Sequence, residues 1–75
     1  MRNMNEILFI VEQEQDGGFI AEAKVNDNEQ IITEGDNIEE LKSMIREALE
    51  CHFENSEDMP KTVRLHFIKD EVFVI

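Results

Sequence analysis

The chain has 75 residues, and its 7 Lys and Arg against 18 Asp and Glu give a formal net charge of −11 at neutral pH. A chain this negative is repelled by phosphate backbones, so direct binding of nucleic acid is not expected, whereas a basic partner would suit it. The length predicts one domain spanning residues 1–75 with a small core, and the apolar runs at 7–11 and 72–75 are far too short to cross a membrane.

Residues 6–13 are predicted to form the first strand. They contain five consecutive apolar residues, rich in β-branched and aromatic types, which are too few for a core helix. An unbroken apolar run of this kind predicts a strand with both faces covered. The polar segment that follows ends in Gly17 and Gly18, which supply the positive φ angles that a hairpin turn needs.

Two further strands are predicted before the helix. Residues 19–25 alternate, with Ala21 and Ala23 on the more apolar face, where small side chains leave room for a helix to approach closely. The polar segment 26–29 predicts a turn, and residues 30–34 predict a short third strand. We expect the three strands to run antiparallel as a meander.

One amphipathic helix is predicted from Asn37 to about Glu54. Asn37 is a good N-cap, and the Glu40 side chain can reach back to its backbone N–H, so the two residues indicate a capping box. At this length the helix measures about 25 Å, enough to cross a small sheet once. One arc of the helix is apolar, with Lys42 as its only charge, and holds Ile38, Leu41, Ile45, Ala48, Leu49, His52 and Phe53.

The last part of the chain is predicted to be a loop and then a strand. Pro60 forbids helical continuation, so residues 55–60 form the loop. Residues 62–68 alternate as a fourth strand. Residues 69–71 form either a tight turn before a short last strand, 72–75, or a bulge in one long strand.

The element order is therefore β-β-β-α-β, or β-β-β-α-β-β if residues 72–75 pair. This is the α+β class, with one helix packed on a small antiparallel sheet. A single helix covers one face of the sheet, and an uncovered apolar face normally marks an interface. We expect a homodimer formed through this face or through the terminal strand. The apolar residues predicted for the uncovered face are Leu8, Ile10, Ile20, Ile32 and Ile68.

The sequence predicts no catalytic residue, no metal site and no cofactor. Cys51 and His52 are adjacent on the helix and point about 100° apart, which is poor geometry for gripping one ion or for a nucleophile and its base. The single cysteine cannot form an internal disulfide, and the N-terminus lacks a basic-then-apolar signal pattern. Both features favour a cytoplasmic location.

Three stretches of the chain resemble the HicB-like antitoxin family. Residues 16–22 are similar to its Gly-aromatic-x-Ala strand, residues 32–41 to its Thr-x-Gly-Asp-Thr/Ser-x-x-Glu-Ala segment, and residues 45–48 to its Ile-x-Glu-Ala helical run. The resemblance implies a partial ribonuclease-H-type fold without catalytic carboxylates. Many members also carry a DNA-binding module, which we do not expect in this short, stand-alone domain.

The resemblance implies a function as well. Members bind a small basic toxin that cleaves messenger RNA and cover its active surface, so this chain would neutralise a basic HicA-type toxin, with complementary charge speeding the encounter. The acids that would steer the partner are Glu22, Glu34, Glu39, Glu40, Glu47 and Glu50.

Two alternatives remain open at this point. The first is an orphan dimeric interaction or structural domain that shares the fold and has no toxin partner. The second is a metal-dependent nuclease that uses Glu12, Glu22 and Glu34, which requires these carboxylates to share ions roughly 4 Å apart. We favour a non-enzymatic binding domain.

Overall fold

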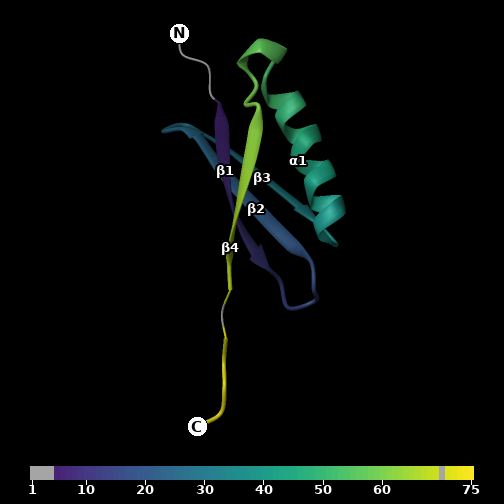
Figure 1. The fold of residues 1–75 in the computed structure, drawn as a ribbon, viewed down its shortest axis with the longest axis vertical. Coiled ribbons are helices and arrows are strands. Elements are labelled where there is room, and N and C mark those ends of the chain that lie inside the picture. The colour runs from purple at the N-terminus through teal and green to yellow at the C-terminus, as the bar shows by residue number, and fades with distance from the viewer. Residues whose placement is uncertain (1–4, 70) are drawn as a thin grey trace.

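The computed structural model describes residues 5–69 and 71–75 and has one helix on one face of a four-stranded sheet (Figure 1). The predicted order and the α+β class are confirmed. The elements are β1 (Glu6–Gln13), β2 (Phe19–Asn26), β3 (Glu29–Gly35), α1 (Ile38–His52), a 3₁₀ turn (Ser56–Asp58) and β4 (Thr62–Ile68).

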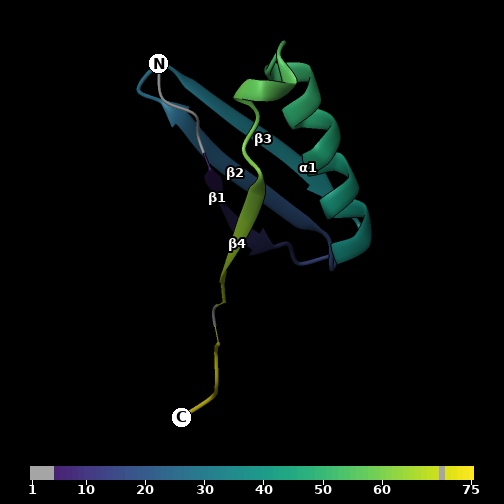
Figure 2. The same ribbon diagram turned by 45° about the horizontal axis from the view of Figure 1, so that its top comes forward.

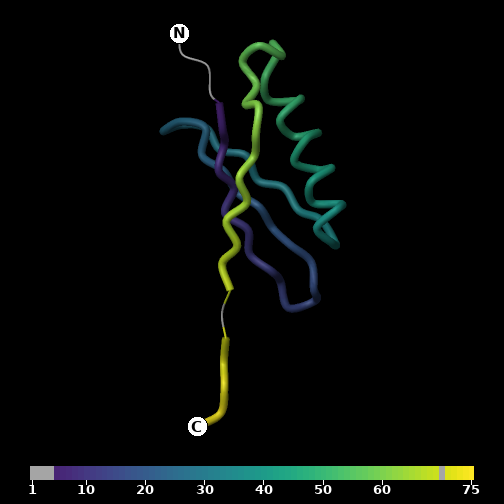
Figure 3. The backbone as a smooth tube through the Cα atoms, viewed as in Figure 1, coloured from purple at the N-terminus to yellow at the C-terminus, as the bar shows by residue number. Residues whose placement is uncertain are grey.

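The sheet is mixed rather than wholly antiparallel, which corrects one prediction. The strands lie in the order β3-β2-β1-β4, and β4 pairs with β1 in parallel. The reason is the crossover: α1 carries the chain back along the sheet after β3, so β4 starts at the end where β3 and β1 also start. The smooth trace in Figure 3 follows this return path.

The core lies between α1 and the sheet. Side chains alternate along each strand, and the buried ones of β1 face the helix together with those of β2 and β3. The helix packs mainly on β3 and, to a smaller extent, on β2. The buried core consists of Ile7, Phe9, Val11, Ala21, Ala23, Ile31, Leu41, Ile45 and Leu49.

The expectation that both faces of β1 are covered is wrong. Ile7, Phe9 and Val11 are buried, but Leu8 exposes 45% of its surface and Ile10 is half-buried. No second layer lies on that side among the described residues, because α1 packs on the opposite face. An apolar run in a strand therefore does not by itself indicate two protein layers.

The hairpin between β1 and β2 needs one positive φ angle rather than two. Gly17 has a φ of 98°, and it is the described residue that adopts this region. The Asp16 carboxylate accepts a hydrogen bond of 3.0 Å from the Gly18 N–H, and the Glu14 N–H donates to the Gly18 carbonyl at 2.7 Å. The hairpin is therefore stabilised by one glycine with a positive φ angle and by an Asx-type turn at Asp16, instead of by two glycines with positive φ angles.

The helix start agrees with the predicted cap in one of its two bonds. The Asn37 side chain accepts a hydrogen bond from the Glu40 N–H at 2.8 Å. The Glu40 carboxylate reaches back as expected but accepts from the Asp36 N–H, at 2.6 Å, instead of that of Asn37. At the other end α1 stops at His52, two residues before the predicted Glu54, with Phe53 as C-cap.

Gly35 lets the helix sit directly against the end of β3. A Cβ atom placed on this buried glycine would lie 2.5 Å from the Leu41 backbone nitrogen and 2.7 Å from the Leu41 Cα. These are backbone atoms of the first helical turn, so they cannot move aside as a flexible side chain would. The contact brings Leu41, which is fully buried, onto the sheet.

The C-terminal residues 71–75 do not form a strand, so neither alternative for this segment, a separate last strand at 72–75 or a continuation of one long strand, is present in the described structure. The predicted turn at 69–71 includes Asp70, which lies outside the described residues. Among the described helices, none has the length and apolar content needed to cross a membrane.

Replacing Gly35 tests the close approach of helix and sheet. We expect Gly35→Ala to lower the free energy of unfolding by about 1–3 kcal/mol, because the added methyl overlaps fixed backbone. Gly18→Ala is the matched control: its Cβ would lie 3.3 Å from the Asp16 carboxylate oxygen and at ordinary contact distance, 3.5 Å, from the Gly35 carbonyl oxygen, so the cost should stay below about 1 kcal/mol. Urea unfolding measures both variants, and equal losses would contradict this account of Gly35.

Candidate functional site

The sheet face turned away from α1, here called the open face, is covered by no other described element (Figure 2). Its side chains are those that alternate with the buried residues of each strand. The strand registers place Glu6, Leu8, Ile10, Glu12, Ile20, Glu22, Lys24, Gln30, Ile32, Glu34, Thr62, Arg64, His66 and Ile68 on it.

Acidic and apolar side chains alternate across this face from strand to strand. Glu22 on β2 is paired on one side with Ile32 of β3 and on the other with Ile10 of β1, which in turn pairs with His66 of β4. Directly paired side chains on one sheet face lie about 5 Å apart, so a carboxylate borders each of these two isoleucines.

The next row across the sheet repeats the pattern in the opposite phase. Ile20 on β2 stands between Glu34 of β3 and Glu12 of β1, and Glu12 is paired with Ile68 of β4. The two rows together form a chequered surface in which apolar side chains are framed by negative charge. We call it the chequered face, meaning Ile10, Glu12, Ile20, Glu22, Ile32, Glu34 and Ile68.

All five apolar residues predicted for the uncovered face lie on the open face. Leu8, Ile32 and Ile68 expose 45%, 57% and 44% of their surface, while Ile10 and Ile20 are half-buried. The face is not purely apolar, because glutamates stand between the isoleucines. Such a surface favours a partner that offers both positive charge and apolar area.

The structure does not bring the six predicted steering acids together. Glu22 and Glu34 lie on the open face, but Glu39, Glu40, Glu47 and Glu50 lie on α1, on the other side of the sheet. The Glu40 carboxylate is occupied by the helix cap. Two further acids of the open face, Glu6 and Glu12, were not among the six predicted residues. Their alternation with the core residues of β1 would have been enough to place them on this face.

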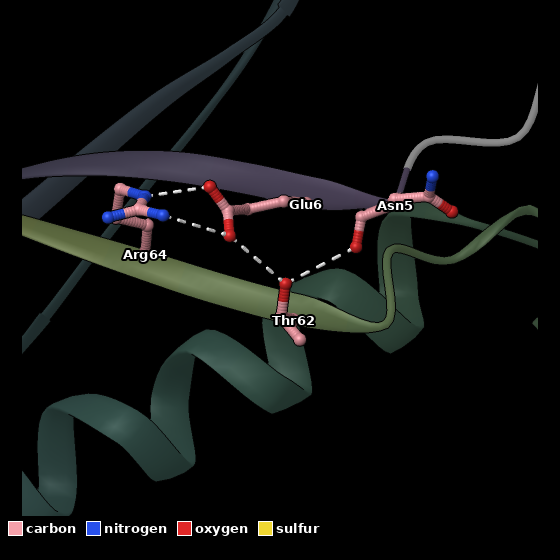
Figure 4. Close-up of polar contacts among 4 residues, drawn as sticks. All are labelled: Asn5, Glu6, Thr62 and Arg64. Atoms are coloured by element: carbon pink, nitrogen blue, oxygen red, sulfur yellow. Dashed lines mark hydrogen bonds and ion pairs between the residues drawn. The ribbon is translucent and has the colours of Figure 1, made fainter.

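The open face also carries an ion pair that the sequence interpretation did not include. Glu6 on β1 accepts a hydrogen bond of 2.7 Å from the Arg64 Nε on β4, and the Thr62 hydroxyl bridges the Asn5 carbonyl and the Glu6 carboxylate at 3.3 Å each (Figure 4). The Thr62 N–H also donates to Asn5, at 3.1 Å. These contacts hold the start of β4 beside the start of β1. Because an antiparallel sheet was expected, the sequence did not predict that Arg64 would lie beside Glu6.

The hydrogen bond from Arg64 lowers the pKa of the Glu6 carboxyl below its ordinary value of 4.5, and the positive charge of Arg64 acts in the same direction. The same bond raises the pKa of the Arg64 guanidinium. Glu6 therefore stays ionised and neutralised, which leaves Glu12, Glu22 and Glu34 as the acids around the isoleucines of the chequered face.

The spacing of Glu12, Glu22 and Glu34 on this face does not favour the alternative of a metal-dependent nuclease. Glu12 and Glu34 are both paired with Ile20, from opposite sides, so their strands are about 10 Å apart with an apolar side chain between them. In residues 5–69 and 71–75 no group of three potential metal-binding side chains converges. His52 instead lies 3.9 Å from the Glu29 carboxylate, and Cys51 is exposed.

A groove of about 460 Å³ lies between α1 and β4, on the helix side of the sheet. Its floor is apolar, with Ile45 and Leu49 from the helix and Val63 and Leu65 from β4, and Met59 closes one end. Three of the chain's seven Lys and Arg residues line it, namely Lys42, Arg46 and Lys61, together with one acid, Glu50. We call it the α1–β4 groove. It is locally basic in a strongly acidic chain.

Comparison with known proteins places the chain in a family. A UPF0150 protein of Thermotoga maritima is 39% identical over 75 residues, which cover 100% of both chains. The chain belongs to the UPF0150 family. A second UPF0150 protein, from Archaeoglobus fulgidus, is 43% identical over 51 residues, which are 68% of this chain and 71% of that protein. No family model and no solved structure matches the chain.

The ion pair predicts a specific pH dependence. Because Arg64 lowers the Glu6 pKa in the folded state, the pair stabilises the fold above the ordinary carboxyl pKa, and this gain is lost as the pH falls through the lowered value. Carbon-13 NMR titration should therefore give a higher Glu6 pKa in Arg64→Met than in the unmodified chain. The melting temperature of Glu6→Gln should lie below that of the unmodified chain near neutral pH, and the two melting temperatures should converge as the pH falls. A Glu6 pKa that Arg64→Met leaves unchanged would contradict the pairing.

Proposed function

We propose that this chain is a protein-binding domain of the HicB-like antitoxin type, which neutralises a small basic, HicA-type toxin by covering its messenger-RNA-cleaving surface. The observation that carries the proposal is the chequered face. It is free of other described elements, and it combines glutamate side chains with exposed and half-buried isoleucines.

The two components of this face would have different effects on binding. Carboxylates that meet a basic surface accelerate encounter and fix orientation, and they exclude acidic partners. Isoleucine side chains that lose contact with water on binding supply most of the affinity. The formal net charge of −11 acts in the same direction at longer range. A basic protein is therefore a better fit than nucleic acid or a membrane.

The sequence resemblance supports the same proposal. The segment similar to the family's Thr-x-Gly-Asp motif spans the end of β3 and the cap of α1, where Gly35 and Asn37 have structural functions. The motif thus builds the scaffold, and two residues of the matched segment, Ile32 and Glu34, also lie on the face that we assign to the partner. The two UPF0150 relatives carry no activity in their names.

The second candidate function is an orphan interaction domain of the same fold, dimeric and without a toxin partner. The exposed apolar residues of the open face favour some partner but do not by themselves require a basic one. A neighbouring reading frame that encodes a small basic protein favours the antitoxin function, and an isolated gene favours the orphan domain. In both cases we propose a cytoplasmic, non-enzymatic protein that forms a homodimer.

The direct test is inhibition of the toxin. The small basic protein encoded beside this gene should co-purify with the chain and should stop cleaving messenger RNA when the chain is present at equal molar ratio. Failure to bind and inhibit it would remove the antitoxin function and leave the orphan domain.

A pair of charge reversals locates the binding surface. Glu22→Lys on the open face and Glu47→Lys on the outer side of α1 change the net charge equally, and both residues are exposed. We expect Glu22→Lys to lower the association rate with the basic partner by about 10-fold or more at low salt. The lysine places a positive charge between Ile10 and Ile32, and this charge repels the partner.

The helix variant should change the same rate by no more than about 3-fold, through long-range charge alone. Surface plasmon resonance at several salt concentrations measures both rates. An equal loss in the two variants would show that the chequered face is not the contact surface.

A further inference from the structure

The C-terminal tail, residues 71–75, is the most exposed apolar segment among the described residues. Val72, Phe73, Val74 and Ile75 expose between 76% and 109% of their reference surface. An exposed apolar run of this kind is unfavourable in water and normally marks an interface. No described element of the fold covers the tail.

The tail cannot reach the α1–β4 groove of its own chain without reversing direction. It leaves the end of β4 at Ile68 and continues away from the helix, as both ribbon views show (Figure 1 and Figure 2). The groove lies beside the first half of β4, at Val63 and Leu65. The apolar segment and the apolar groove are therefore at opposite ends of one strand.

β4 also offers a free edge for pairing. It is the outermost strand on its side of the sheet, and its register with β1 runs from Glu6 and Thr62 to Glu12 and Ile68 without a bulge. It contains no proline, and α1 packs near the other edge, on β3. An uncovered, regular edge of this kind accepts another strand through backbone hydrogen bonds.

We propose that the tail of a second copy of this chain adds as an antiparallel strand to the free edge of β4 and lays side chains over the α1–β4 groove. The contact is reciprocal in a two-fold dimer, because each copy has one tail and one groove. The inference concerns the homodimer of the proposed function and needs no toxin.

The geometry of a strand supports this arrangement. Val63, Leu65 and Phe67 face the helix side, so counting in twos along the chain assigns Phe73 and Ile75 to that same side. In an antiparallel pair formed about a two-fold axis near Ile68, Phe73 lies opposite Val63 of the other copy and Ile75 lies opposite Lys61, and both of these partners line the groove. Val72 and Val74 then extend the open face.

Charge complementarity favours the tail over a basic partner in the groove. The groove rim carries Lys42, Arg46 and Lys61, whereas the tail begins with Glu71. A basic toxin would be repelled there. Dimerisation at this edge also leaves the chequered face free, so binding of the toxin and self-association use separate surfaces.

Complementation between two variants tests the exchange. Phe73→Asp damages the tail, Val63→Asp damages the groove floor, and Val63 is 37% exposed, so the core is not entered. Each variant alone should sediment as an 8.8 kDa monomer, with the dimer dissociation constant raised by about 100-fold. An equal mixture should form heterodimers, because the intact tail of the Val63→Asp chain meets the intact groove of the Phe73→Asp chain.

Ile32→Asp is the matched control, since Ile32 is an exposed apolar residue of the open face on the far edge strand. It should dimerise as the unmodified chain does.

Sedimentation equilibrium, with circular dichroism to confirm folding, gives the decision. Three results would each overturn tail exchange. The first is an unmodified chain that stays monomeric at the highest concentration tested; the second is a Phe73→Asp dimer as stable as that of the unmodified chain; the third is a mixture of the two variants that stays monomeric. None of these results bears on toxin inhibition, which is measured separately.

Discussion

The contact between α1 and the end of β3 decides how this small sheet is covered. Gly35 has no side chain, so the first turn of the helix rests on the strand backbone, and Leu41, Ile45 and Leu49 point into the core from there. The helix consequently lies over the β3 and β2 side of the sheet. Because a single helix is only about 10 Å wide and neighbouring strands lie about 5 Å apart, the opposite edge strand, β4, is left partly open.

Three kinds of incompletely covered apolar surface follow from this arrangement. The open face mixes isoleucines with glutamates, the α1–β4 groove has an apolar floor and a basic rim, and the tail is apolar and exposed. Their charges differ although the chain as a whole is acidic. Electrostatics therefore separates the surfaces: a basic partner suits the first, and an acidic apolar segment suits the second.

This separation gives the proposed antitoxin a simple physical design. Self-association at the β4 edge would join two sheets without covering Glu22 or its isoleucine neighbours, so each copy keeps a surface for a basic protein. Both contacts would relieve the exposure of apolar side chains that a domain of 75 residues cannot bury by itself.

Much of the fold was readable from local patterns. The strands at 6–13 and 62–68 have the predicted bounds, and the helix has the predicted cap residue and apolar arc. The five apolar residues assigned to the uncovered face are on it. These features depend on alternation and on capping, which are properties of neighbouring residues and need no knowledge of the tertiary fold.

The remaining features depend on which strands become neighbours, and a sequence does not state this directly. Parallel pairing of β4 with β1 brought Glu6 to Arg64, and the β2 register placed Glu22 between Ile10 and Ile32. The acids of α1 and those of the strands are all glutamates, so residue type does not distinguish them, yet the two groups lie on opposite sides of the sheet. Residue pattern therefore determined the elements and the faces of each strand, while the crossover of α1 decided the strand order and with it which charges meet.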